Sequence, residues 1–232
     1  MKSTLEKKIA IVTGAGGETG SAIAYALAET GACVVVNDIN PDRAERISAA
    51  IRQDGHEAVA IAADVANRFQ CVNLIESTRE HWGGIDILVN NAAVQPVAPI
   101  LKMDEWAWQR CLDINLKGAF FMSQLVGRVM VDENQERGGV IINIGTATGN
   151  DLPETGLAAY VASKEGLAGF TRQCAREFAP HGIHVYIVQP GTIDKETVGE
   201  VSERAKRSLV IADVVLHLCS STRSATIPDE EK

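Results

Sequence analysis

The stretch that decides the fold reads Lys8-Ile-Ala-Ile-Val-Thr-Gly-Ala-Gly-Gly-Glu-Thr-Gly-Ser-Ala-Ile-Ala-Tyr-Ala-Leu-Ala-Glu-Thr30. Its apolar start, residues 8–13, predicts a buried strand, and the alanine-rich run 18–30 predicts a helix. The glycines between them predict a tight turn that leaves backbone N–H groups and the helix N-terminus facing outward. Pyrophosphate binds at such turns, although a purely structural turn is the alternative. The residues expected to contact it are Gly14, Gly16, Gly17, Thr19 and Gly20.

The alternation of strand and helix continues along the chain. Short runs rich in valine, isoleucine and alanine lack polar alternation, which is typical of strands buried on both faces of a parallel sheet. Further strands are expected at residues 32–37, 57–62, 85–90, 138–144 and 184–189, and further helices at 41–54, 67–82, 104–131 and 157–180. Right-handed crossovers then give an α/β fold, a doubly wound parallel sheet with helices on both faces.

No repeat, low-complexity segment or linker divides the chain. We therefore expect a single domain over residues 1–232. A short irregular lobe is expected at about 192–209, a last helix at 210–221 and a frayed tail at about 225–232.

Composition excludes several classes of protein. The formal net charge of −8 leaves no basic stripe for nucleic acid. The five cysteines form no Cys-x-x-Cys pair and the five histidines show no metal spacing, so neither a disulfide framework nor a metal site is expected. No apolar run is long enough to cross a bilayer and no signal segment stands at residues 1–8, which predicts a cytoplasmic protein with no membrane partner.

An aspartate follows the second predicted strand. Asp38 lies eighteen residues beyond Gly20, where a carboxylate accepts hydrogen bonds from the adenosine ribose of a dinucleotide. A carboxylate there repels a 2′-phosphate, and the glycine turn has no arginine or lysine to offset it. NAD is therefore expected as the cofactor, with NADP less favoured. A capping or turn aspartate is the alternative.

A tyrosine and a lysine lie one helical turn apart in Ala159-Tyr-Val-Ala-Ser-Lys164. Positions i and i+4 share a helix face, so the ammonium of Lys164 is expected near the Tyr160 phenol. A close cation favours the phenolate, which lets a tyrosine give or take a proton at a carbonyl or alcohol oxygen. The spacing alone is a weak signal, because an exposed helix face gives the same pattern.

Taken together, these motifs resemble the short-chain dehydrogenase/reductase family. Its elements stand in family order over residues 7–191 and again over 211–221. They are the turn 13–20, Asp38, Ala63-Asp64-Val65, Asp86-Ile-Leu-Val-Asn-Asn-Ala92, Asp113-Ile-Asn-Leu-Lys-Gly118, Ile142-Asn-Ile-Gly-Thr146, Tyr160-x-x-x-Lys164 and Gln189-Pro-Gly-Thr-Ile193. The resemblance implies a Rossmann-like domain that transfers hydride between NAD and a secondary alcohol or ketone.

The resemblance also implies roles for particular residues. Tyr160 exchanges the proton, Lys164 holds the nicotinamide ribose, Thr146 holds the reacting oxygen and Asn115 holds a water that resupplies the proton through Lys164. The residues implied along the rest of the cofactor are Asp64 and Val65 at the adenine, Asn91 and Ala92 on the fourth strand, and Pro190 and Ile193 at the nicotinamide. Asp86 is expected to be a turn residue.

The chain departs from the family pattern in three places. Glu18 takes the place of the middle glycine and brings a carboxylate toward the pyrophosphate. Threonine replaces the usual serine at Thr146. The region beyond Gly191 is short, and the usual seventh strand is missing after Ser224, which predicts a more open substrate site and an exposed sheet edge.

Glu18 and the short lobe leave a non-catalytic or weakly active nucleotide-binding protein as the alternative function. The glycine spacing alone suggests a third, an epimerase or dehydratase. A homodimer or homotetramer is expected through the helices at 104–131 and 157–180. Trp82, Trp106 and Trp108 are expected in the core or at an interface.

Overall fold

Six parallel strands form one sheet in the computed structural model, which describes residues 5–134, 137–146, 155–190 and 203–221. The strands are β1 (Ile9–Val12), β2 (Cys33–Asp38), β3 (Ala58–Ala62), β4 (Ile87–Asn90), β5 (Gly139–Ile144) and β6 (Ile183–Val188). Their order is β3-β2-β1-β4-β5-β6, and β1 pairs with both β2 and β4. The direction of winding therefore reverses between β1 and β4, which opens a crevice at the carboxyl ends of these strands.

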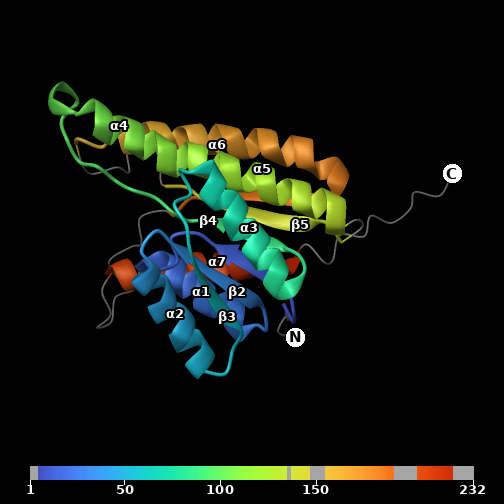
Figure 1. Cartoon of the computed structure of the whole chain (residues 1–232). Helices are drawn as coiled ribbons and strands as arrows, with labels where there is room; N and C mark the ends of the chain where they lie inside the picture. Colours follow the sequence, from blue (N-terminus) through green and yellow to red (C-terminus); the bar gives the residue numbers. More distant parts are fainter. Residues whose placement is uncertain (1–4, 135–136, 147–154, 191–202, 222–232) are drawn as a thin grey trace.

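Helices cover both faces of the sheet (Figure 1). One layer contains α1 (Glu18–Glu29), α2 (Pro41–Gln53) and α7 (Glu203–Ser221). The other contains α3 (Arg68–Trp82), α4 (Glu105–Leu112), α5 (Ala119–Val129) and α6 (Ala158–Phe178). Short helical turns are η1 (Ile100–Lys102), η2 (Asp113–Gly118), η3 (Met130–Asn134) and η6 (Ala179–His181). The predicted α/β fold is confirmed as a single Rossmann-like domain.

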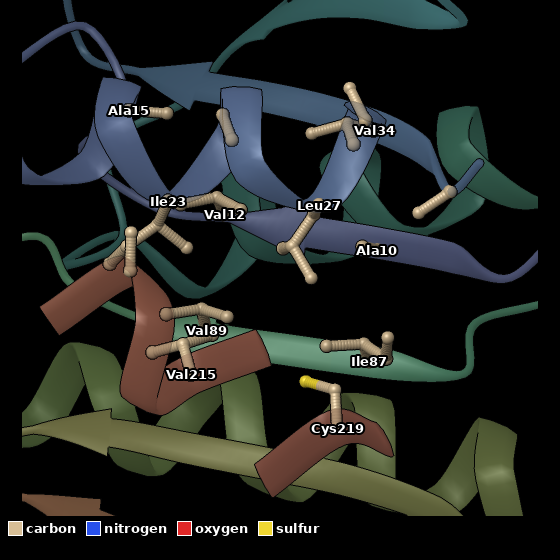
Figure 2. Packing of buried hydrophobic residues seen from close by; sticks show 14 of the residues in the cluster. Ala10, Val12, Ala15, Ile23, Leu27, Val34, Ile87, Val89, Val215 and Cys219 are labelled. Atoms are coloured by element: carbon tan, nitrogen blue, oxygen red, sulfur yellow. The ribbon is translucent and has the colours of Figure 1, made fainter. Parts of the chain in front are cut away.

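The strands divide the core into two apolar clusters. Ala10 and Val12 face the cluster under α1 and α7, whereas Ile11 between them faces the cluster under α3 and α5. Figure 2 shows Leu27 of α1 and Val215 of α7 in the first cluster beside β1 and β4. Because both faces of the central strands are buried, these strands show no polar alternation.

The edge strand β3 corrects one expectation. Its middle residues are only partly buried, and Ala62 is exposed. An edge strand has a neighbour on one side only, so its apolar sequence did not require burial on both faces.

The helix expected at 104–131 is also more complex. Residues from Glu105 to Asn134 stay helical, but η2 and η3 are π-helical turns within that run. A π-turn adds one residue to a helical turn, and apolar periodicity does not reveal such a local shift.

The last helix begins at Glu203, seven residues before the start expected from the sequence, so part of the predicted irregular lobe is helical. Ser208 and Ile211 are buried and extend the face that carries Val215 and Cys219. Packing against α1 therefore lengthens the helix into a polar segment.

The predictions for the tail, for the missing seventh strand and for Ile193 concern residues outside the described ranges. Within those ranges, no helix is long and apolar enough to cross a membrane.

Candidate active site

A cleft of about 1160 Å³ lies at the carboxyl ends of the strands. It brings together residues predicted from motifs far apart in the sequence. The predicted residues that line it are Gly14, Gly17, Thr19, Gly20, Asp38, Asp64, Val65, Asn91, Ala92, Thr146, Tyr160, Lys164 and Pro190. Gly16 and Asn115 are buried beside the cleft.

The glycines of the turn serve two purposes. Asn91 Nδ2 donates to the carbonyl oxygens of Thr13 at 2.9 Å and Gly14 at 3.2 Å. A Cβ at Gly20 would lie 2.6 Å from that nitrogen, so this glycine makes room for Asn91. A Cβ at Gly17 would meet only the Gly14 carbonyl oxygen, at 3.4 Å. Gly17 is the N-cap residue of α1 and provides no side-chain cap, which leaves backbone donors at the helix N-terminus available to an anion.

Asp38 lies directly beside this turn. Its Oδ2 accepts from the Gly16 backbone N–H at 3.2 Å, and its Oδ1 accepts from the Asn40 backbone N–H at 2.9 Å. The cap of α2 is Asn40, whose Oδ1 accepts from the backbone of Asp42 and Arg43. Asp38 is therefore not the helix cap, but its bond to Asn40 is that of a turn aspartate, and each of its oxygens keeps acceptor capacity for a ligand hydroxyl.

Charged residues that the motifs did not indicate also line the cleft. Arg43, Arg110 and Arg207 contribute to its wall, as does Glu18, which is exposed in the first turn of α1. Arg110 Nη2 lies 3.0 Å from Asp64 Oδ2, so the carboxylate implied at the adenine already has a partner. Nothing in the local sequence linked these two residues, because they are brought together by the fold.

The α7 helix closes one side of the cleft. Thr19 Oγ1 lies 3.0 Å from Ser208 Oγ, a hydrogen bond that ties the glycine turn to α7. On another part of the wall, Trp106 is 72% exposed, so of the two positions expected for this residue the core is excluded and the interface is untested. It lies in the first turn of α4.

Tyr160 and Lys164 lie on the same face of α6, as their spacing predicts. Lys164 Nζ is 5.8 Å from the centre of the Tyr160 ring and donates to the Ile144 carbonyl oxygen at 2.6 Å. Burial lowers the pKa of Lys164 to about 8, while the nearby Cys111 acts in the opposite direction. The hydrogen bond holds the ammonium at the end of β5, two residues before Thr146.

Asn115 is the centre of a buried network beneath the cleft. Its Oδ1 accepts from the Val94 backbone N–H at 2.8 Å, and its Nδ2 donates to the Val94 carbonyl oxygen and to Ser163 Oγ, both at 2.9 Å. Ser163 Oγ in turn donates to the Tyr160 carbonyl oxygen at 2.7 Å. The side chain of Asn115 thus joins η2 to α6 and to the segment after β4.

Sequence reasoning missed the other members of this network. Cys111 Sγ lies 3.3 Å from Asn115 Nδ2, and Ser163 directly precedes Lys164. A signal for Ser163 was its polar character one helical turn from Ala159 and Leu167, on the buried side of α6. Asp86, expected to be a turn residue, binds Lys8 at 2.5 Å and accepts from the Ile9 backbone N–H at 3.0 Å, just before β4 at the amino end of the sheet.

No group of three or more metal-ligating side chains occurs in the described part of the chain. The five cysteines are free thiols, four of them buried. A second hollow, of about 880 Å³, lies near Glu6, Glu29 and His217 and contains none of the predicted site residues.

A parallel sheet with a glycine-rich turn at its switch point, a carboxylate beside that turn and a tyrosine–lysine pair across the cleft defines a dinucleotide-binding α/β protein. The family model described as short chain dehydrogenase matches residues 8–206. The chain belongs to this family of oxidoreductases, whose members use nicotinamide cofactors on CH–OH groups of small molecules.

Relatives and solved structures agree with this assignment. Galactitol 2-dehydrogenase of Agrobacterium fabrum is 40% identical over 192 residues, which cover 83% of this chain and 73% of the relative. The crystal structure of a hydroxysteroid dehydrogenase from Escherichia coli matches with a TM-score of 0.83 at 32% identity, over 96% of this chain and 93% of the other. A metagenomic short-chain oxidoreductase in complex with NADP matches with a TM-score of 0.82 at 30% identity, over 95% and 94%.

Proposed function

We propose that the chain is an NAD-dependent oxidoreductase that transfers hydride between nicotinamide and a secondary alcohol or ketone, with Tyr160 as the acid and base. One observation carries the proposal. Tyr160, Lys164 and Thr146 line the same cleft as the glycine turn and Asp38, so a proton donor and a dinucleotide site share one space.

The residues present fit a dinucleotide. The open space at Gly17 and the uncapped start of α1 suit a pyrophosphate. Asp38 would accept from the adenosine ribose, and its negative charge supports NAD over NADP. The expected repulsion between Glu18 and the pyrophosphate remains a prediction.

Each catalytic side chain has a physical task. Bound NAD or NADH accepts or supplies the hydride. Thr146 would hold the reacting oxygen through its hydroxyl, and Tyr160 would give or take the proton at that oxygen. The buried ammonium of Lys164 would stabilise the phenolate between turnovers and bind the nicotinamide ribose.

Asn115 has a different place in this mechanism. Both N–H groups of its side chain are directed at protein acceptors, so the amide orients Ser163 and the segment around Val94. The water expected at Asn115 would therefore have to form its hydrogen bond with an atom other than Nδ2 of this side chain.

The experiment replaces Tyr160 by phenylalanine. Turnover with a panel of secondary alcohols and ketones should fall at least about 100-fold, since general acid–base groups contribute about 10² to 10⁴. NADH binding, followed by fluorescence, should persist because the ring remains. Tyr186→Phe, on the partly buried strand β6, is the matched control and should keep activity. Turnover that survives in Tyr160→Phe would rule out the mechanism, and binding without turnover in the unaltered chain would favour the non-catalytic alternative.

A further inference from the structure

The segment that follows β4 is held in place at both of its ends. At one end, the backbone of Val94 forms two hydrogen bonds with the side chain of Asn115, at 2.8 and 2.9 Å. At the other end, the Ala98 backbone N–H donates to the Gly156 carbonyl oxygen at 2.9 Å. Gly156 has a φ of +91°, and a Cβ there would lie 3.2 Å from the Ala98 backbone, so this close approach requires a glycine.

This segment lies beside the residues that are proposed to act on the substrate. Asn115, which holds its first residue, also binds Ser163, whose hydroxyl donates to the Tyr160 carbonyl oxygen. Residues 94–96 line the same cleft as Thr146 and Tyr160. A substituent of a ketone whose oxygen is bound at Tyr160 would therefore extend along residues 94–96.

The charged side chains of the cleft lie at the glycine turn and the neighbouring strand ends. Asp38 accepts from the turn, and Asp64 pairs with Arg110. Lys164 is buried and donates to the end of β5. The charged residues of the described lining are Glu18, Asp38, Arg43, Asp64, Arg110, Lys164 and Arg207. They surround the space proposed for the dinucleotide, and none of them belongs to the segment after β4.

Residues 94–96 offer few polar groups to a ligand. Both backbone groups of Val94 are used by Asn115, and Pro96 has no N–H. Gln95 supplies the one polar side chain of the three. A carboxylate or phosphate placed here would lose water without gaining an ion partner among these residues, whereas an apolar group would gain from leaving water.

We propose that the substrate is a ketone or secondary alcohol with an uncharged, apolar substituent that packs against Val94 and Pro96. Substrates with an anionic or hydroxyl-rich group at this position would be disfavoured. The inference rests on the proposed function and names the substrate class for the same site.

The test measures kcat/KM with NADH for two pairs of ketones of matched shape. In the first pair, 5-methyl-2-hexanone has two methyl groups where 4-oxopentanoate has carboxylate oxygens. The unaltered chain should prefer the uncharged ketone at least about tenfold, because the carboxylate would lose water. In the second pair, 2-hexanone should exceed 5-hydroxy-2-pentanone at least about threefold.

The outcomes separate this inference from the proposed function. Equal values within either pair, or a preference for the carboxylate or the hydroxyl, would overturn the inference and leave the proposed function intact. If the chain bound NADH but reduced none of the four ketones, the proposed function itself would fail.

Two variants locate the contact. Val94→Thr exchanges a methyl group for a hydroxyl, so the ratio of kcat/KM for 5-methyl-2-hexanone to that for 4-oxopentanoate should fall about threefold. Val97→Thr is the matched control, since Val97 is 62% exposed and does not line the cleft, and it should leave the ratio unchanged. Fluorescence titration should give the same NADH affinity for both variants. An unaltered ratio in Val94→Thr would show that the substrate does not contact Val94, and the inference would be wrong.

Discussion

At the scale of single residues, Lys164 carries its charge where water is almost excluded. The side chain is 3% exposed, and its ammonium donates a hydrogen bond to the Ile144 carbonyl oxygen. A charged lysine in such a place is destabilised relative to a neutral one, which is why its pKa falls to about 8. Burial of this ammonium therefore lowers the stability of the folded protein, but it places a cation beside Tyr160.

The lowered pKa of Lys164 in the folded state predicts that the free energy of unfolding depends on pH. An unfolded lysine titrates near pH ~10.4, so between about pH 8 and 10 the unfolded chain binds more protons at this group than the folded chain. The contribution of Lys164 to the free energy of unfolding should therefore rise by about 2 kcal/mol from pH 8 to pH 10, at about 1.36 kcal/mol per displaced proton and pH unit.

Urea unfolding of the unaltered chain and of Lys164→Met measures this contribution. Other groups also titrate in this range, but they are common to both proteins and cancel in the difference. Parallel stability curves for the two proteins between pH 8 and 10 would contradict the assignment.

Asp38 leads to a second prediction at this scale. In Asp38→Ala the carboxylate that repels a 2′-phosphate is gone, while Arg43 still lines the same wall of the cleft. The ratio of kcat/KM for NAD to that for NADP should fall at least about tenfold, about 1.4 kcal/mol in transition-state binding. Asp42→Ala, on the exposed start of α2, is the control and should leave the ratio unchanged. A ratio that stays constant in Asp38→Ala would remove the basis for preferring NAD.

At the scale of elements, the pairing of α1 with α7 supports the cleft. The two helices pack through Ile23, Leu27, Val215 and Cys219 over β1 and β4 (Figure 2). The Thr19–Ser208 hydrogen bond continues this contact to the glycine turn. The position of the glycine turn in the cleft thus depends on the apolar packing between α1 and α7.

Truncating one side chain tests this packing. Val215 is fully buried, so Val215→Ala should lower the free energy of unfolding by about 2 kcal/mol through lost burial and a residual cavity. Val214→Ala, at a neighbouring position that is 40% exposed, should change it by less than about 0.5 kcal/mol. Because both variants gain the same helix propensity, their difference in chemical denaturation reports packing alone. Equal effects would show that α7 is not anchored here.

At the scale of the whole molecule, we propose a homodimer or homotetramer in a reducing compartment, where the five free thiols are stable. Light scattering on the eluting protein should give two or four times the chain mass. Phe120 of α5 is partly exposed and packs edge-on against Phe170 of α6, with ring centres 6.2 Å apart. Phe120→Lys should reduce the mass by placing a charge on this apolar face. Leu101→Lys, on η1, is the control and should leave the mass unchanged. If the unaltered chain had the mass of a monomer, the proposal would be wrong.

Part of this description could be read from local patterns. Apolar runs predicted the six strands, including the edge strand β3, because a short apolar run between helical segments is recognised without knowledge of its neighbours. The glycine turn, Asp38 and the Tyr160–Lys164 pair were found because their function requires fixed spacing along the chain. The start of α7 was not predicted, because packing against α1 leaves no periodic signal in the sequence. The π-turns were not predicted either, because a one-residue shift within a helix leaves no such signal.

The sequence by itself therefore determined the alternation of elements, the family and part of the lining of the cleft, since these are encoded in short motifs with fixed spacing. Only the tertiary structure decided which side chains meet. Asn115 lies 48 positions from Ser163 and 21 positions from Val94, and its amide binds both. Hydrogen bonds depend on distances of about 3 Å between atoms, and for residues remote in the chain those distances are set by the packing of the sheet and its two helical layers.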